Sequence, residues 1–332
     1  MTTTRYLFGA LAAVALSAML SVNPAESGET QKWDMPMAYA EKNYHSQTGK
    51  AFAACVNTAT SGEIEITVHT SGSLFKGNEI KRAVQTGQVP IGERLLSAHL
   101  NENPIFGIDS VPFLATSFEE SEKLFKAARP TLEKILAEQN LVLLYSVPWP
   151  PQGLYTKKPI ESVADLKGVK FRAYNAATAR FAELAGMVPV QIEAAELSQA
   201  LATGVVEAMI TSGATGYDRK VWEHLTHHYQ IDSWMPRNSV IVNKQVWEGL
   251  SERVRNEIRG CADLAAYAGY WRAVQYTDFT LNKLRENGMW VGPAGEKLQK
   301  ELKEIGEVML AEWLESAGPE GKAIIEAYRA MK

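Results

Sequence analysis

Two arginines lie inside apolar strand patterns, where a charged side chain needs a partner. Arg172 alternates with Phe171 and Ala173, so its side chain points to the opposite face of the predicted strand. Arg94 follows Glu93 in another apolar segment, either as a cleft contact or as part of a buried ion pair. A guanidinium group matches both carboxylate oxygens with parallel N–H donors. The pattern alone nevertheless favours a surface arginine at a strand end for Arg172.

Polar side chains follow two of the predicted strands. Tyr174 and Asn175 come directly after the strand that carries Arg172. Asn175 can contact a ligand, cap the following helix, or do both. Thr211 and Ser212 add hydroxyl groups at the end of a later apolar segment, in front of a glycine. They provide ligand contacts if the backbone comes close to a ligand there, and otherwise belong to a simple loop of small residues.

Aromatic residues are frequent around the middle of the chain. Trp149 lies between two prolines and Trp234 lies two residues before one, so we expect both in a cleft between domains. Tyr39 and His45 lie at a predicted strand-to-helix turn, and helix N-termini that face a cleft favour anions. Aromatic residues fill cores more often than they contact ligands, so none of these positions is decisive by itself.

Signatures of catalysis and of metal binding are missing from the sequence. It has no G-x-S-x-G elbow, no glycine-rich phosphate loop and no H-E-x-x-H motif. A hydrolase with Ser212 as nucleophile and a cleft histidine as base is the enzymatic alternative. His224, His227 and His228 are spaced so that two imidazoles can share one helical face, fewer than a metal site needs, and we interpret them as a solvated helix end. We therefore expect no enzyme, no metal and no cofactor.

Composition and charge describe an ordinary soluble globular protein. The 332 residues are 46% hydrophobic and 22% charged, with a net charge of -4. No stripe of Lys and Arg occurs, and nucleic-acid binding requires such clustered cations to neutralise phosphates. Nucleic acid is therefore not an expected partner.

Residues 1–27 are predicted to be a signal peptide. Arg5 is followed by an apolar run from Tyr6 to Leu20, shorter than the roughly 20 residues of a membrane span. Small residues then place the cleavage between Ala25 and Gly28. A retained membrane anchor is the alternative. The mature chain is expected outside the cytoplasm, in the periplasm if the source is a Gram-negative bacterium.

Strand and helix signals alternate along the mature chain, which favours an α/β architecture. The expected strands are 63–70, 88–96, 141–147, 169–174, 188–192, 205–211, 228–234 and 239–243. The expected helices are 43–60, 78–86, 118–139, 176–185, 195–203, 216–225, 296–317 and 322–332. Three prolines, Pro148, Pro150 and Pro151, indicate the first crossing between two domains.

Residues 251–287 read as one unusually long helix. The segment contains no proline, and Gly288 is well placed to end it. At roughly 1.5 Å per residue it exceeds the span of one domain, so we expect it to brace two domains. Cys55 and Cys261 lie in separate helical patterns. They form either a disulfide or two buried thiols, because the sequence favours neither.

Four segments together resemble the solute-binding proteins of TRAP (tripartite ATP-independent periplasmic) transporters of the DctP type. Residues 165–175 read DLKGVKFRAYN, a "DLKGxKxR" run, and Pro189-Val190 follows as a short "PV" strand. Residues 196–207 read ELSQALATGVVE, and the loop 111–114 also fits. The resemblance covers about residue 33 to the C-terminus. It implies a two-domain periplasmic binding protein fold, with crossing hinge strands and a long helix that spans both domains.

The resemblance also implies the domain limits, the partners and the role of Arg172. We expect domain I at 28–148 plus about 238–275, and domain II at 149–237 plus about 276–332. Arg172 matches the arginine that binds the ligand carboxylate in a bidentate salt bridge. The partners are a small organic acid and the small and large membrane subunits of a permease. A sensory binding protein for the same ligand is the alternative.

Two departures from the family pattern bear on the ligand. Gln152 lies roughly where many relatives carry a second arginine, and Thr211 lies where relatives often carry an asparagine. The missing arginine favours one carboxylate with neutral polar or aromatic groups. We therefore expect a monocarboxylate, an aromatic or branched 2-oxo or 2-hydroxy acid, with a C4-dicarboxylate or sugar acid as the alternative.

Overall fold

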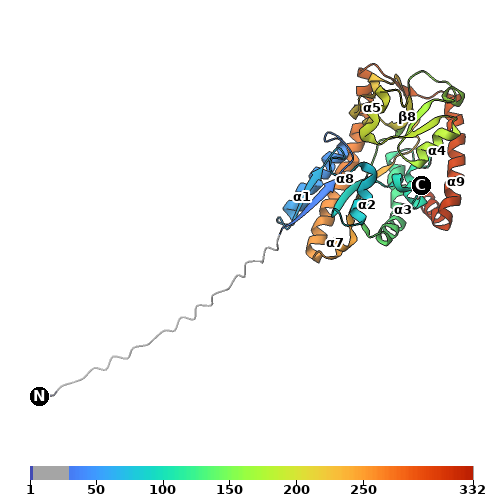
Figure 1. The fold of residues 1–332 in the computed structure, drawn as a ribbon. Coiled ribbons are helices and arrows are strands. Elements are labelled where there is room, and N and C mark those ends of the chain that lie inside the picture. The colour runs from blue at the N-terminus through green and yellow to red at the C-terminus, as the bar shows by residue number, and fades with distance from the viewer. Residues whose placement is uncertain (3–29, 332) are drawn as a thin grey trace.

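The chain folds into two α/β lobes (Figure 1). The structure is a computed structural model that describes residues 1–2 and 30–331. Apart from its first two residues, the expected signal peptide lies outside the described residues. Figure 1 shows α4, α5 and β8 in one lobe, and α1, α2, α3 and α7 in the other.

The first lobe contains two small sheets. A parallel pair, β1 and β2, lies next to a sheet of order β3-β10-β4, whose central strand β10 is buried along its whole length. The strands are β1 (Gln31–Pro36), β2 (Ile64–His69), β3 (Ile91–Leu95), β4 (Leu141–Pro148) and β10 (Arg237–Asn243). The helices are α1 (Tyr44–Ala59), η1 (Gly77–Glu79), α2 (Ile80–Gln85), η2 (Leu96–His99), η3 (Pro104–Ser110), α3 (Phe118–Glu138) and α7 (Lys244–Glu248).

The second lobe is built on a mixed sheet of order β11-β9-β5-β8-β6-β7. Its strands are β5 (Gln152–Thr156), β6 (Lys170–Ala173), β7 (Val188–Gln191), β8 (Ala208–Ser212), β9 (His227–Gln230) and β11 (Trp290–Pro293). Its helices are η4 (Val163–Leu166), α4 (Ala176–Leu184), η5 (Ala194–Glu196), α5 (Leu197–Ala202), α6 (Gly213–Asp218) and η6 (Val221–Glu223). Strand β6 is parallel to both β7 and β8, so the carboxyl ends of these three strands meet at one edge.

Two chain segments cross side by side from one lobe to the other. The first joins β4 to β5 and the second leads from β9 into β10. The backbone N–H of Trp149 donates to the carbonyl of Pro236 at 2.8 Å, and that of Gln152 donates to Trp234 at 3.0 Å. The prolines around the first crossing cannot donate such bonds, which limits the pairing to a few residues. These segments form the hinge expected from the sequence.

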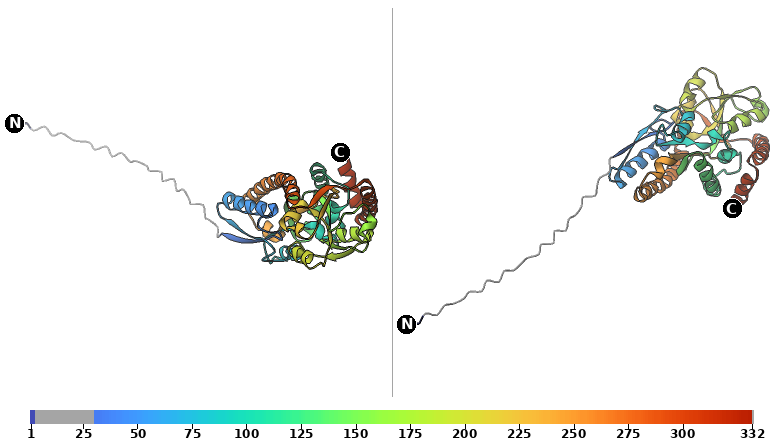
Figure 2. Two further views of the ribbon diagram at one scale, coloured as in Figure 1. Left: turned by 90° about the horizontal axis from the view of Figure 1, so that it is seen from above. Right: turned by 60° about the horizontal axis from the view of Figure 1, so that its bottom comes forward.

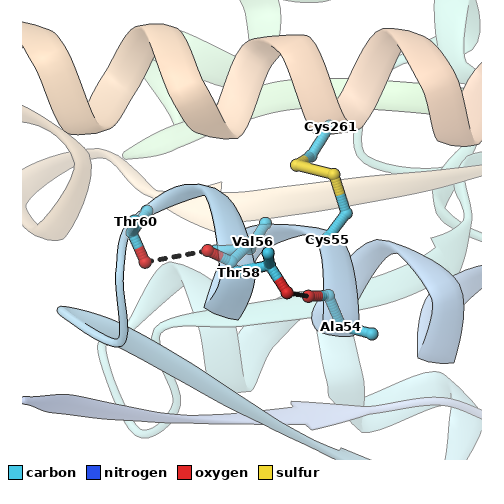
Figure 3. Close-up of a disulfide and its surroundings, with 6 residues drawn as sticks. All are labelled: Ala54, Cys55, Val56, Thr58, Thr60 and Cys261. Carbon is cyan, nitrogen blue, oxygen red and sulfur yellow. Dashed lines mark hydrogen bonds between the residues drawn. A yellow bond between two sulfur atoms is a disulfide. The ribbon is translucent and has the colours of Figure 1, made fainter.

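Helix α8 (Glu252–Glu286) contacts both lobes, packing on α1 and β4 in the first and on α6 and β11 in the second. It begins at Ser251, whose side chain accepts a hydrogen bond from the Val254 amide, and Gly288 follows its end with a φ of 87°. The expected brace is therefore present. Cys55 of α1 and Cys261 of α8 form a disulfide (Figure 3), which decides between the two alternatives left by the sequence.

Helix α9 (Glu296–Ala330) is interrupted at Gly318, whose φ of 60° and ψ of -145° are not helical. The two parts match the two helices expected there. The first part packs on α4, whereas Ile324, Ile325 and Tyr328 of the second join the apolar cluster beneath α3 in the first lobe. The end of the chain therefore lies on the first lobe, although the predicted domain limits place it in domain II. Figures 1 and 2 show α9 at the opposite end of the molecule from β1.

The interpretation of the histidines as a solvated helix end is wrong. His227 and His228 lie in β9, and His228 is only 2% exposed. The helix expected over 216–225 is replaced by the short elements α6 and η6. Strands β5 and β11 are also not indicated by the sequence pattern, since both are short and one follows three prolines.

Candidate functional site

A cavity of about 440 Å³ lies between the two lobes, beside the hinge. Its lining residues come from both lobes and both crossing segments: Tyr39, Arg94, Leu95, Trp149, Gln152, Arg172, Tyr174, Glu193, Ala194, Thr211, Thr215 and Pro236. Seven of the eleven residues selected from the sequence are among them.

The parallel strands of the second lobe deliver their polar residues to this cavity. Arg172 is the next-to-last residue of β6, Glu193 follows β7, and Thr211 lies near the end of β8. Because β6 is parallel to β7 and β8, these carboxyl ends lie at the same edge of the sheet. Ligands of open α/β sheets bind outside the carboxyl ends of the strands. The position of the cavity follows from the topology of this sheet.

Arg172 is a buried cation that keeps part of its hydrogen-bonding capacity free. It is 3% exposed, its Nε donates to the carbonyl of Ile192 at 2.9 Å, and its guanidinium carbon lies 5.1 Å from the centre of the Tyr174 ring. Burial lowers the pKa of the guanidinium. Among residues 30–331 its two terminal nitrogens donate no hydrogen bond and it forms no ion pair. An anionic ligand would supply the missing partner.

Arg94 lies on the opposite wall and is held within a chain of polar contacts. Its Nη2 is 3.4 Å from Oε1 of Glu193, and its Nε donates to Nε2 of His99 at 3.3 Å. Nδ1 of His99 lies 2.9 Å from Glu102, which also accepts from the buried Lys81. Burial and the neighbouring cations lower the pKa of His99 to about 4, so its ring is neutral near pH 7. Arg94 is therefore a cleft residue whose charge is paired across the lobes.

Neutral groups complete the walls of the cavity. The rings of Tyr39 and Trp149 meet edge to face with centroids 4.8 Å apart, and the Trp149 Nε1 donates to Asn238 at 2.8 Å. Burial raises the pKa of Tyr39 to about 12, so its hydroxyl stays protonated. Gln152 donates from Nε2 to the carbonyl of Pro150 at 2.8 Å, which directs the amide along the hinge.

Two residues expected at the site lie just behind the lining. His45 is 1% exposed, packs against Trp149 with tilted rings whose centroids are 4.3 Å apart, and its Nδ1 lies 3.2 Å from Glu93. The partner of Glu93 is therefore His45 rather than Arg94. Trp234 is 1% exposed and donates from Nε1 to the Tyr174 hydroxyl at 2.8 Å, so it supports a lining residue instead of lining the cavity.

Asn175 and Ser212 act as helix caps at the edge of the site. The Asn175 side chain accepts from the Thr178 amide at 2.9 Å and donates to Ser97 of the other lobe at 3.1 Å. The Ser212 hydroxyl accepts from the Thr215 amide at 3.3 Å, and the residue is fully buried. Neither side chain lines the cavity, and the Ser212 hydroxyl is not presented as a nucleophile.

Five lining residues are not selected by the sequence analysis: Leu95, Glu193, Ala194, Thr215 and Pro236. Glu193 is the one with chemical importance. Glu193 comes directly after the predicted strand 188–192, which pairs in parallel with the strand that carries Arg172, and this position points to the same edge of the sheet. Among the described residues, no helix combines the length and apolar character needed to cross a bilayer. The same residues hold no cluster of metal-ligating side chains.

Two α/β lobes, paired crossing strands and a charged cavity between them define the fold of periplasmic binding proteins. The model of the bacterial extracellular solute-binding proteins, family 7, matches residues 37–316. The chain belongs to this family, the DctP-type solute-binding proteins of TRAP transporters. It is the solute-binding component of such a transporter, a class that acts outside the cytoplasm together with membrane permease subunits.

Several proteins of known structure or function are similar to this chain. A TRAP solute-binding protein from an unidentified microbe of a marine metagenome, specific for pyroglutamate and solved with co-purified pyroglutamate, is 55% identical, with a TM-score of 0.90 over 91% of this chain and 100% of that chain. The Bordetella pertussis receptor DctP7, which binds pyroglutamic acid, is 44% identical, with a TM-score of 0.89 over 90% and 100% of the two chains. The monocarboxylate 2-oxoacid-binding periplasmic protein of Nostoc sp. is 25% identical over 72% of this chain and 68% of its own length.

Proposed function

We propose that the chain captures a small cyclic monocarboxylate, with pyroglutamate as the first candidate, in the cavity between its lobes. The observation that carries this proposal is the charge of the lining. Arg94, Arg172 and Glu193 are the charged residues of the described lining, so the net charge is +1. One carboxylate on Arg172 makes the closed cavity neutral, whereas a second would add an unpaired buried charge.

The choice of pyroglutamate rests on the similar structures together with the cavity. Proteins 55% and 44% identical to this chain bind pyroglutamate. The cavity also matches the chemistry of that acid, which combines one carboxylate with an uncharged polar ring. We propose pyroglutamate in place of the aromatic or branched 2-oxo or 2-hydroxy acid expected from the sequence, and we keep the expectation of a single carboxylate.

Capture proceeds by closure of the two lobes around the ligand. Side chains of both lobes already meet around the cavity, with Asn43 donating to Asp218 at 2.7 Å and Asn175 donating to Ser97 at 3.1 Å. The hinge strands let the lobes separate, and a ligand that binds both walls stabilises the closed form. We propose that Arg172 binds the carboxylate, that the neutral groups fit the ring, and that no covalent step follows.

Export and delivery complete the proposal. Residues 1–27 direct the chain to the periplasm, where the disulfide between Cys55 and Cys261 forms. The closed, loaded form then docks on the small and large membrane subunits of a TRAP permease. The family membership supports this sequence of events.

Thermal unfolding of the mature protein against a panel of organic acids tests the proposal. A ligand at a thousand times its Kd adds about 4 kcal/mol to the free energy of unfolding. We expect pyroglutamate to raise the Tm of the wild type and of Arg82→Ala, a control at an exposed arginine outside the cavity, but not that of Arg172→Ala. If pyroglutamate shifts none of the three proteins, or Arg172→Ala as much as the wild type, the proposed function is wrong.

A further inference from the structure

Glu193 is an unexpected residue in a cavity that binds an anion. A carboxylate there repels the ligand carboxylate unless another charge compensates it. Its Oε1 lies 3.4 Å from Nη2 of Arg94, and the two residues come from different lobes. The pair therefore forms across the cavity itself, and both partners contribute to its lining.

The Arg94 side of this pair is fixed from behind. Its Nε–H donates to Nε2 of His99, and the contact of His99 with Glu102 sets the ring so that Nδ1 carries the proton. A methyl group at Gly77 would lie 2.8 Å from both Arg94 Nη1 and Glu193 Oε2, so the backbone of η1 closes the remaining side. The guanidinium and the carboxylate are therefore closely confined on the side of Gly77.

We propose that Arg94 and Glu193 act together as a neutral donor and acceptor pair that recognises the amide group of a cyclic monocarboxylate. A lactam presents its N–H and its C=O on adjacent ring atoms, on the same edge. Glu193 accepts from the N–H while Arg94 donates to the C=O, and Arg172 binds the carboxylate. This inference rests on the proposed function, and it adds the groups that distinguish a lactam from other acids of the same size.

The same pair explains how a cavity with two arginines selects one negative charge. Arg94 is only 4% exposed and its charge is already matched by Glu193, so a second ligand carboxylate would meet Glu193 at close range. Sites that hydrogen-bond a polar group of the ligand reject analogues without it, because their own buried groups are then left unpaired. The contact between Arg94 and Glu193 thus has two effects: it favours a ligand with an amide group and it disfavours a dicarboxylate.

Calorimetric titration with three ligands tests the inference: pyroglutamate, its lactone analogue, in which oxygen replaces the ring N–H, and glutarate, a dicarboxylate. We expect the wild type to bind the lactam at least about tenfold tighter than the lactone. In Glu193→Ala the lactam preference should fall below about threefold, and glutarate should gain at least about tenfold through the freed Arg94. Glu196→Ala, an exposed carboxylate of the same segment, should bind all three ligands like the wild type.

A second variant separates the hydrogen bond from the charge. Glu193→Gln keeps an acceptor but removes the negative charge, so it should gain affinity for glutarate while it keeps the preference for the lactam. If the wild type binds pyroglutamate through Arg172 and both variants keep its selectivity, the inference is overturned and the proposed function stands. If the wild type binds no pyroglutamate, the proposed ligand is wrong and amide recognition is overturned with it.

Discussion

The two walls of the cavity each present an arginine, and the two differ in what surrounds them. Arg94 on the first lobe contacts Glu193 and His99, and its neighbours Glu102 and Lys81 are paired with each other. Arg172 on the second lobe rests on the Tyr174 ring and a backbone carbonyl. Both are less than 5% exposed. The positive charge of Arg94 is thus compensated by the protein itself, whereas the positive charge of Arg172 is available to a ligand.

This difference shows that residue type alone does not identify a ligand anchor. A buried guanidinium without an anionic partner is costly, and only the binding of an anion repays that cost. A buried guanidinium with a carboxylate partner carries no such demand. The identity of the anchor therefore depends on the partner residue, and for Arg94 that partner lies on the other lobe.

The largest expected effect separates the two arginines by their contribution to affinity. Arg172→Ala should weaken pyroglutamate binding by about 4 kcal/mol, or roughly a thousandfold, because the ligand carboxylate loses its partner in a dry cavity. The double variant Arg94→Ala/Glu193→Ala keeps the net charge of the lining and should lose about tenfold or less. Calorimetric titration measures both values. Equal losses in the two proteins would show that the walls do not differ in this way.

The disulfide sharpens the comparison, since it braces α1 and α8 on the first-lobe side and neither cysteine lines the cavity. Replacing both cysteines by serine should lower the free energy of unfolding by about 3 kcal/mol. The Kd for the ligand should stay within about twofold, because the cavity is untouched. Denaturant unfolding measures the stability and calorimetric titration measures the Kd. The wild type with its disulfide reduced should give the same two results as the double serine variant. A large loss of affinity would show that ligand binding in the cavity depends on the disulfide.

The neutral state of His99 gives the first wall a pH dependence. Its pKa is about 4 in the folded protein and 6.5 when unfolded, so below pH 6.5 the unfolded chain binds the extra proton. The free energy of unfolding should therefore fall as the pH drops from about 6.5 towards 4.5, by on the order of 2 kcal/mol.

His99→Gln retains an acceptor for Arg94 without titrating, and it should make this part of the pH profile flatter. The buried His228, whose pKa burial lowers to about 3, contributes in the same direction in both proteins. The difference between the wild type and the variant is therefore the quantity to measure, by denaturant unfolding at a series of pH values. Identical profiles would show that folding does not shift the pKa of His99.

The smallest expected effect concerns a hydrogen bond between the lobes that involves neither arginine. Ser97→Ala removes the acceptor for Asn175 while leaving the Asn175 cap on α4 intact. The closed form should lose about 1 kcal/mol, which corresponds to roughly fivefold faster ligand release. Stopped-flow release kinetics measure the effect, with the exposed Ser73→Ala as control. An unchanged release rate would mean that closure does not depend on this contact.

Much of the fold can be predicted because its signals are local. Alternating residues indicate β2, and an uninterrupted helical pattern with a cap at each end indicates α8. Strand β5 follows three prolines and β11 has only four residues, so their strand character comes from pairing with β8 and β9. Such pairing is a property of the tertiary structure, and a short segment does not reveal it.

The residues of the candidate site also differ in whether a local sequence signal locates them. Arg172, Tyr174 and Thr211 come at or near the carboxyl ends of predicted strands, so the sequence places them at the correct edge. Trp234 lies behind the lining, where its indole N–H donates to the hydroxyl of the lining residue Tyr174. Arg94 and Glu193 are 99 residues apart and meet only when the lobes meet. A local sequence pattern cannot predict a contact between residues so far apart in the chain.

The central position of β10 sets the order in which the chain can fold after it is synthesised. In the first lobe, β10 lies between β3 and β4, yet it is synthesised only after strands β5 to β9 of the second lobe. Until residue 243 is available, β3 and β4 have unpaired edges that invite association with other chains. Strands β5 to β9 of the second lobe are already complete at that stage, so this part of its sheet can form before the first lobe does, and the edge strand β11 joins it later. Any factor that keeps the chain unfolded until β10 is complete would therefore also protect these edges from association.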